Sequence, residues 1–343
     1  MAPLEGAVLP QGSWILVTGV NGFVGSHVAD QFLQHGYNVR GTVRDAKKNA
    51  WVARHFETQY GTGRFELVEL QNLTDLEATK KALEGCAGFA ATASDVTFSL
   101  DPNNVIPQAV QLIKTGLEAA AATPSVKRFV QTSSSATAWF GEHDTVFDIT
   151  TDTWNTRQVE QAWATPPHKP DHGLAVYCAS KTKQEQEAWK YVKERKPGFV
   201  FNAVLPDYVI GKILSVENQG YPSSLAYAKL IWDGDMAQAT VLPPQYEVDS
   251  EDIGRLHVAA MLHPDAQGER IFGFAYPKNA TLTVQYLREL YPERQFKDVP
   301  GKEAEYLANI LPRSRAEELL KWVKGGGWTG YKESLRHTCD TLL

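Results

Sequence analysis

A glycine-rich turn between a strand and a helix constrains the fold of this chain more than any other feature. Apolar residues 14–17 lead into Gly19, Gly22 and Gly25, and residues 23–33 continue with helical periodicity. The first glycine permits a tight turn, the second lets backbone N–H groups approach a pyrophosphate, and the third lets the helix pack close to the strand. The N-terminus of the helix adds the positive end of its dipole, so the turn and the helix together predict a site for the phosphates of a nucleotide. Glycines at G-x-x-G-x-x-G spacing also occur for packing alone.

Strands and helices alternate regularly after this turn. Strands are expected at 14–17, 37–44, 65–70, 88–93 and 128–134, separated by helices at 23–33, 46–60, 72–83 and 105–122. No hairpin turns join these strands, so the pattern predicts a parallel sheet with helices on both faces. The predicted fold class is α/β, a Rossmann-type doubly wound parallel sheet. Its ligand crevice would lie beyond the carboxyl ends of the strands.

The pattern loosens beyond Trp139, which suggests a second, smaller unit. A helix (177–196), two strands (200–205 and 270–275) and a further helix (253–262) continue the alternation, while prolines and glycines break the remainder. We assign residues 8–210, with about 246–275, to a dinucleotide-binding domain. Residues from about 211–245 and 276–343 are assigned to a smaller, mainly C-terminal substrate lobe.

Composition excludes several classes of partner. The formal net charge of −6 argues against nucleic acid. Cys86, Cys178 and Cys339 are odd in number and widely spaced, which indicates reduced thiols and neither a disulfide framework nor a metal site. No signal peptide is evident in residues 1–12, and no apolar run is long enough to cross a bilayer. The expectation is a cytoplasmic protein without a membrane partner.

The end of the second expected strand indicates which dinucleotide is bound. Proteins of this fold that prefer NAD place Asp or Glu there to bind the ribose 2′-OH, whereas this chain has Arg44. An arginine can hold a 2′-phosphate through two charge-assisted hydrogen bonds. Lys47 and Lys48 follow, either as further phosphate ligands or as a solvated helix start, and Asp45 should point elsewhere. The predicted cofactor is NADP(H).

Tyr177 and Lys181 form a second constellation. Spaced at i and i+4, their side chains share one face of a helix. A free tyrosine, with a pKa of about 10, is a poor acid–base group near neutrality, but a nearby ammonium stabilises the phenolate and lowers that pKa. The pattern Y-x-x-x-K often occurs by chance. Here it follows a predicted nucleotide-binding unit, which favours a catalytic role for Tyr177 and Lys181.

A run of hydroxyl side chains, Thr132 to Ser135, ends the fifth expected strand. A hydroxyl at the carboxyl edge of a central strand can bond a carbonyl oxygen that gains negative charge. Serines at such a position also cap the following turn. The residues alone do not decide which serine faces the crevice.

Three motifs in order, TGVNGFVG (18–25), TSSSAT (132–137) and YCASK (177–181), resemble the extended short-chain dehydrogenase/reductase family. The tracts 39–45, 123–130 and 205–211 are similar to its dihydroflavonol-reductase-like branch, and most to the NADPH-dependent aldehyde and carbonyl reductases of yeasts and fungi. The likeness runs from about Val8 to Gly330.

The resemblance implies roles for individual residues. Ser134 would orient the carbonyl, Tyr177 would donate the proton and Lys181 would lower the pKa of Tyr177. Pro206 would begin a segment that closes over the nicotinamide, and Phe23 and Val24 would offer backbone N–H groups to the pyrophosphate. The full set of expected cofactor-binding residues is Gly19, Gly22, Phe23, Val24, Gly25, Arg44, Lys48, Asn72, Leu73, Ala93, Thr132, Tyr177, Lys181, Pro206 and Val209.

Two positions depart from the family pattern. Asn72 stands where the family usually has Asp near the adenine, which keeps an acceptor and loses a charge. The motif usually read H-x-A-S is Ala91 to Ser94, which removes an imidazole and leaves the strand-end backbone. Neither change puts the reaction in doubt.

The implied function is NADPH-dependent reduction of aldehydes and ketones, keto esters included, to alcohols by hydride transfer. Cys178, beside the tyrosine, is expected to be a packed thiol because nothing adjacent activates it. An apolar and aromatic pocket would suit a hydrophobic substrate, although each of its candidate residues could equally be core. The apolar and aromatic candidates are Val96, Phe98, Trp139, Tyr208, Leu242 and Tyr246, and Gln245 is the candidate polar contact of this pocket.

Other readings stay open. A sugar-nucleotide epimerase or dehydratase shares the Ser, Tyr and Lys but recycles a bound NAD, so Arg44 counts against it. A non-catalytic NADP-sensing module would not need the Tyr–Lys pair. A steroid or flavonoid reductase differs only in substrate. The partner expected is a small carbonyl compound, and the chain is expected to act as a monomer or homodimer.

Overall fold

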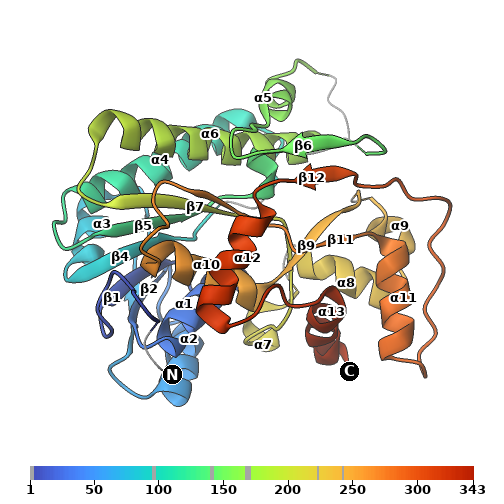
Figure 1. The fold of residues 1–343 in the computed structure, drawn as a ribbon, viewed down its shortest axis with the longest axis horizontal. Helices are drawn as coiled ribbons and strands as arrows, with labels where there is room; N and C mark the ends of the chain where they lie inside the picture. Colours follow the sequence, from blue (N-terminus) through green and yellow to red (C-terminus); the bar gives the residue numbers. More distant parts are fainter. Residues whose placement is uncertain (1–3, 95–97, 140–142, 167–170, 222–223, 242) are drawn as a thin grey trace.

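A parallel sheet forms the centre of the structure, a computed structural model that describes residues 4–94, 98–139, 143–166, 171–221, 224–241 and 243–343. Among these residues seven strands lie side by side in the order β10-β7-β5-β4-β1-β2-β3 (Figure 1). Every neighbouring pair is parallel. The strands are β1 (Trp14–Thr18), β2 (Asn38–Val43), β3 (Phe65–Glu69), β4 (Cys86–Ala91), β5 (Arg128–Thr132), β7 (Val200–Pro206) and β10 (Arg270–Gly273). The predicted α/β doubly wound sheet is confirmed.

The strand order reverses direction at β1. From β1 the chain moves outward through β2 to β3, then returns to β4 on the other side of β1 and continues to β5, β7 and β10. At such a reversal the loops that leave the two central strands diverge and open a crevice at their carboxyl ends. The glycine turn after β1 and the serine run after β5 both lie at this edge.

Helices cover both faces of the sheet (Figure 1). On one face α1, α10 and α12 share a core with Ile15 and Val17 of β1. On the other face α3, α4 and α6 pack on Leu16, Phe89 and Phe129. The flanking helices are α1 (Phe23–Gln34), α2 (Ala50–Tyr60), α3 (Leu76–Leu83), α4 (Pro102–Ala121), α6 (His172–Arg195), α10 (Ser250–Leu262) and α12 (Arg313–Lys324).

A smaller group of elements lies beyond the end of the sheet, at the right of Figure 1. A three-stranded sheet, in which β9 pairs with β8 in parallel and with β11 in antiparallel fashion, packs with four helices. The elements are β8 (Tyr208–Ile210), β9 (Gln245–Asp249), β11 (Tyr276–Lys278), α8 (Ser224–Asp233), α9 (Met236–Ala239), α11 (Ala280–Leu290) and α13 (Tyr331–Cys339). The short helix α7 (Val216–Gln219) follows β8.

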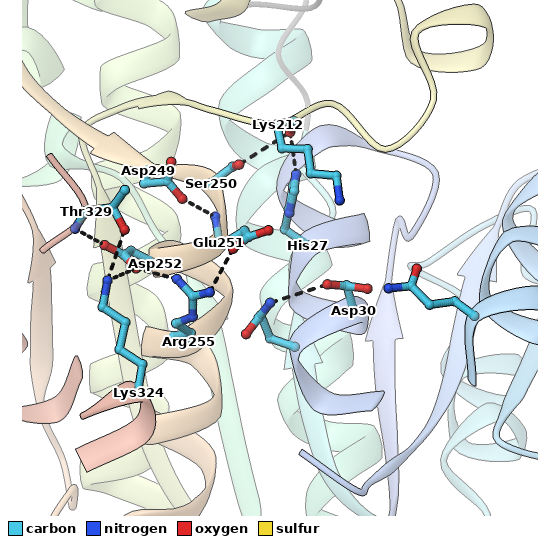
Figure 2. Close-up of polar contacts among 12 residues, drawn as sticks. His27, Asp30, Lys212, Asp249, Ser250, Glu251, Asp252, Arg255, Lys324 and Thr329 are labelled. Carbon is cyan, nitrogen blue, oxygen red and sulfur yellow. Dashed lines mark hydrogen bonds and ion pairs between the residues drawn. The ribbon is translucent and has the colours of Figure 1, made fainter. Parts of the chain in front are cut away.

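Part of the C-terminal region returns to the large sheet. The α12 residues Leu319 and Leu320 are fully buried in the same core as β1. Figure 2 shows the polar link between α12 and α10: the buried carboxylate of Asp252 pairs with Lys324 at 2.7 Å and with Arg255 at 2.8 Å. A segment assigned from the sequence to the smaller lobe therefore packs on the nucleotide-binding half.

Two short strands and a short helix pack on the α6 side of the large sheet. Strand β6 (Phe147–Ile149) pairs in parallel with β12 (Ala308–Ile310), and α5 (Thr156–Ala162) packs on α6. Within the described residues no helix is long and apolar enough to span a membrane. Cys86, Cys178 and Cys339 are buried, free thiols.

Helix boundaries differ from the expectation at several places: the helices expected from residues 72, 105 and 253 begin at Leu76, Pro102 and Ser250. The helix expected from residue 46 begins at Ala50, because the carboxylates of Asp45 and Glu69 accept the N–H groups of Lys48 and Ala46 and fold residues 44–49 into a turn. The helix that carries Tyr177 begins earlier than expected, at His172.

A buried histidine predicts a pH-dependent stability. His257 Nδ1 donates to the Ile253 carbonyl, so Nε2 accepts from Thr132 at 2.7 Å, and burial lowers the His257 pKa to about 4. In the unfolded chain His257 is protonated near pH 6.5, whereas in the native state it is protonated only near pH 4. The free energy of unfolding should therefore decrease by roughly 3 kcal/mol as the pH falls from 6.5 to 4. We expect the difference in free energy of unfolding between wild type and His257→Gln, measured with urea, to become smaller from pH 7 to pH 4, because glutamine does not titrate. A constant gap would show that His257 does not titrate in this way.

Candidate active site

The turn after β1 has the form of a phosphate cradle. Gly19 has φ +67°, a left-handed conformation that favours glycine. A Cβ on Gly25 would lie 2.4 Å from the Gly19 carbonyl oxygen, so only glycine lets α1 pack this close. Among the described residues no side chain caps the N-terminus of α1 at Gly22. A dinucleotide phosphate fits there, because it would accept the N–H groups at Phe23 and Val24.

The segment after β8 lies beside this cradle. Figure 2 shows the His27 ring of α1 directed at the Lys212 carbonyl, and the two atoms are 2.7 Å apart. Gln219 of α7 donates to the Gly22 carbonyl at 3.3 Å and to Ser26 Oγ at 3.0 Å. The glycine turn is therefore held from both sides, by the large sheet and by the segment that enters the smaller lobe.

Arg44 stands exposed just after β2, at the end of the crevice where the ribose of an adenine nucleotide would bind. The neighbouring Asp45 accepts the Lys48 N–H at 2.9 Å, so this carboxylate serves the turn and is directed away from a ligand, as expected. Lys48 is exposed in the same turn. This charge pattern fits a 2′-phosphate.

Tyr177, Lys181 and Ser134 meet at the carboxyl end of β5. Tyr177 and Lys181 lie one turn apart on α6, and Tyr177 Oη is 3.5 Å from Ser134 Oγ. Lys181 Nζ donates to the Thr132 carbonyl at 3.2 Å. The structure thus brings together the three side chains to which the sequence assigned the chemistry.

The proton affinities of this group differ from the expectation. Burial raises the pKa of Tyr177 to about 12, although the Ser134 hydrogen bond acts in the opposite direction. Burial also lowers the pKa of Lys181 to about 8. Burial sets the direction of the Tyr177 pKa in this structure, and its lowering by Lys181 beside a bound nicotinamide remains a prediction. A phenol that keeps its proton is the form that can donate one.

Ser133 points away from this group into a buried network. Its hydroxyl donates to Glu185 Oε2 at 2.5 Å, and Glu185 pairs with Arg270 at 2.7 Å. Thr137 also donates to Glu185 at 2.7 Å. Neighbouring serines on an extended strand face opposite sides, so the one on the network side is Ser133 and the one on the tyrosine side is Ser134.

These orientations predict different effects for two adjacent substitutions. Ser134→Ala should lower kcat/KM about 100-fold, because an oxygen-orienting donor is lost. Ser133→Ala should leave turnover nearly unchanged but destabilise the fold by about 1–3 kcal/mol, since Glu185 loses a buried partner. Steady-state rates and urea midpoints measured on both variants test this. The reverse order of rates would place Ser133 in the mechanism.

Three further residues expected to bind the cofactor lie at one edge of the crevice. Leu73, Ala93 and Thr132 border a hollow of about 380 Å³, its mouth included, between the ends of β1, β4 and β5. Asn72 differs from the expectation, because its Oδ1 accepts from Thr74 N at 2.9 Å and leaves its amide N–H groups for a ligand. Pro206 ends β7, and Val209 is buried in β8.

The expected substrate residues divide into three groups. Trp139 and Gln245 line a second hollow of about 230 Å³, Tyr246 packs behind it on Tyr306, and the Phe98 ring lies 5.1 Å from that of Tyr177. Tyr208 instead packs on Tyr227 in the core of the smaller lobe. Val96 and Leu242 lie outside the described residues.

Sequence reasoning missed several residues of the second hollow. Among the described residues, those that line it are Ser135, Trp139, His143, Asp207, Pro243, Gln245 and Tyr306. Asp207 could have been singled out, because a carboxyl directly after Pro206 must lie at the carboxyl end of a central strand. His143 and Tyr306 fall in segments without periodicity, where the sequence gives no signal.

Known proteins align with nearly the whole chain. Residues 15–212 match the model of the NAD dependent epimerase/dehydratase family. Aldehyde reductase 2 of Sporidiobolus salmonicolor is 39% identical over 340 residues, which cover 98% of this chain and 98% of the relative. Ketoreductase nvfG of Aspergillus novofumigatus is 34% identical over 331 residues, which cover 95% of this chain and 96% of the relative.

A solved structure with the same fold is that of Gre2 from Candida albicans in complex with NADPH, with a TM-score of 0.81 and 22% identity over 96% of this chain and 98% of Gre2. That likeness concerns the fold. The family match and the relatives span the glycine turn, the serine run and the Tyr–Lys helix. The chain belongs to the NAD dependent epimerase/dehydratase family, the extended short-chain dehydrogenases/reductases.

Proposed function

We propose that this protein reduces aldehydes and ketones, keto esters included, to alcohols with NADPH. The observation that carries the proposal is the 3.5 Å approach of Tyr177 Oη to Ser134 Oγ at the crevice edge of β5, one helical turn from Lys181. A protonated phenol beside a hydroxyl is suited to receive a carbonyl oxygen that is becoming an alkoxide. Full-length similarity to an aldehyde reductase and a ketoreductase supports the same reaction.

Each residue of the group has a separate task. Ser134 donates a hydrogen bond to the carbonyl oxygen and orients it toward Tyr177. Tyr177 gives its proton to that oxygen, and solvent protons restore the phenol after turnover. Lys181, held on the Thr132 carbonyl, stabilises the phenolate that forms. NADPH, when bound, supplies the hydride for the carbonyl carbon, so that one carbonyl, one NADPH and one proton give an alcohol and NADP⁺.

Arg44 and Lys48 would hold the 2′-phosphate of the cofactor. Arg44→Ala should raise the KM for NADPH about tenfold or more, because a charge-assisted bond is lost, and should change the KM for NADH little. Arg54→Ala, which removes an exposed cation from the following helix, is the matched control. Equal changes in both KM values would make Arg44 a surface charge only.

The activity itself is tested by following NADPH oxidation with a panel of aldehydes, α- and β-keto esters, aryl ketones and a dihydroflavonol, with NADH in parallel. Turnover of several simple carbonyl compounds, faster with NADPH, is expected. Cofactor binding without turnover across the panel would favour an epimerase or a sensor. We also propose that the protein is a monomer or homodimer, that it is cytoplasmic, and that the smaller lobe binds the substrate.

A further inference from the structure

The second hollow, which we name the Asp207 pocket, lies beside the proposed catalytic group. It is bordered by Ser135, the residue that follows Ser134, and by Asp207, which follows the last residue of β7. Ser135 Oγ donates to Asp207 Oδ1 at 2.9 Å, which places the carboxyl beside the residue that follows Ser134. A substrate whose carbonyl sits at Tyr177 would extend into this pocket.

Asp207 keeps free hydrogen-bonding capacity toward the pocket. Its Oδ1 accepts from Ser135 Oγ at 2.9 Å and its Oδ2 accepts from the Tyr246 N–H at 2.9 Å. Each carboxylate oxygen has two acceptor positions, so one remains on each. Burial raises the Asp207 pKa to about 6, while these two bonds and the charge of Lys278 oppose the rise. The group is therefore an anion at neutral pH.

Aromatic rings form the other walls. The Trp139 and Tyr306 rings, both at the pocket, have centroids 4.8 Å apart, and the Tyr246 ring lies 5.6 Å from Tyr306. Ring faces attract cations through their quadrupole, and tryptophan does so most strongly. A carboxylate with aromatic walls is a combination that stabilises positive charge and repels negative charge.

The nearest counter-ion does not line the pocket. Lys278 is buried in the smaller lobe, with its ammonium 3.9 Å from the Tyr208 ring centroid and 4.0 Å from that of Tyr227. It also faces the carboxyls of Glu247 and Glu303, which share its charge. A ligand in the pocket would thus contact Asp207 directly, whereas Lys278 would not contact the ligand.

We propose that the Asp207 pocket selects carbonyl substrates that carry an ammonium or another hydrogen-bond donor away from the reacting carbon, and that it rejects carboxylates. The proposal depends on the reductase function proposed above. Asp207 is a specificity-determining residue in this account, and the pocket is the place where one carbonyl compound is distinguished from another.

The test uses three methyl ketones of equal chain length that end in a trimethylammonium group, a methyl ester or a carboxylate. In wild type, kcat/KM should be highest for the ammonium ketone and at least about 100-fold lower for the carboxylate. Asp207→Asn should shrink the ammonium-to-carboxylate ratio about tenfold or more. Asp233→Asn, which removes an exposed carboxylate from α8, should leave the ratio unchanged.

A second measurement needs only wild type, should Asp207→Asn fail to fold. The ammonium-to-ester ratio of kcat/KM cancels the titration of the catalytic group, and it should fall as pH drops through about 6 and Asp207 becomes protonated. The other titratable groups that face Asp207 are Tyr177, Tyr208, Tyr246, Tyr306, Lys278 and Glu247. The tyrosines and the lysine do not change charge between pH 5 and 7, whereas burial raises the pKa of Glu247, so the fall should also persist in Glu247→Gln. His143 shares the pocket, so the fall should persist in His143→Gln.

The outcomes separate the two proposals. Loss of all reduction, the neutral ester included, would contradict the reductase function. If the ester is reduced but wild type shows the same kcat/KM for the ammonium and carboxylate ketones, the pocket proposal alone is overturned. The same holds if wild type shows the preference and Asp207→Asn leaves it unchanged. A wild-type preference for the carboxylate would also overturn it.

Discussion

Tyr177→Phe should lower kcat about 10³-fold, because the proton that the phenol gives to the developing alkoxide is lost. NADPH binding, measured by fluorescence titration, should stay within a few-fold of wild type, since a phenyl ring fills the same space. Burial raises the pKa of Tyr177 to about 12, so the phenol keeps its proton at neutral pH until the alkoxide develops.

Tyr191→Phe is the matched control, because Tyr191 lies on the same helix but packs on the apolar core away from the crevice. It should leave kcat unchanged. Near-wild-type turnover of Tyr177→Phe would remove Tyr177 from the mechanism, whatever its position in the crevice.

Arg270→Met should destabilise the fold by about 3–5 kcal/mol, since it leaves the Glu185 carboxylate buried without its counter-ion. The Arg270 side chain is 6% exposed and that of Glu185 is 0% exposed. Arg270 also donates to the carbonyls of Thr151 and Thr153 and lies 3.9 Å above the Trp154 ring. One side chain therefore joins β10, α6 and the segment after β6.

Urea unfolding of three variants tests this prediction. Arg315→Met breaks a partly exposed pair with Glu269 and should cost no more than about 1 kcal/mol. The double variant Arg270→Met/Glu185→Gln should recover part of the loss, because the unpaired charge is gone. If Arg270→Met were no worse than Arg315→Met, the pair would not hold this part of the fold.

The sheet and the glycine turn could be predicted because their signals are local. Apolar runs, glycine spacing and helical periodicity up to residue 134 each report on a few neighbouring residues, and the parallel order follows from the alternation. The pairing of β6 with β12 could not be predicted in this way, since it joins three-residue strands far apart in the chain.

In the candidate site too, residues with a local sequence signal could be predicted and residues brought together by the fold could not. Tyr177 and Lys181 are visible from their spacing on one helix, and Arg44 from its place after a strand. The orientation of Ser133 and Ser134 became clear only from the buried Glu185–Arg270 pair, and both partners lie far from the serines in sequence. Asp207 and Tyr306 line one pocket although they lie far apart in the sequence.

The central claim is that hydride passes from NADPH to a carbonyl carbon and stays in the product. The most direct measurement uses NADPH that carries deuterium at both C4 positions of the nicotinamide, with an aldehyde that the protein accepts, and locates deuterium by mass spectrometry. We expect one deuterium on the carbinol carbon of each alcohol formed and a matching amount of NADP⁺. Turnover that leaves the cofactor reduced, with no deuterium in the product, would contradict the account and indicate an enzyme that recycles its cofactor.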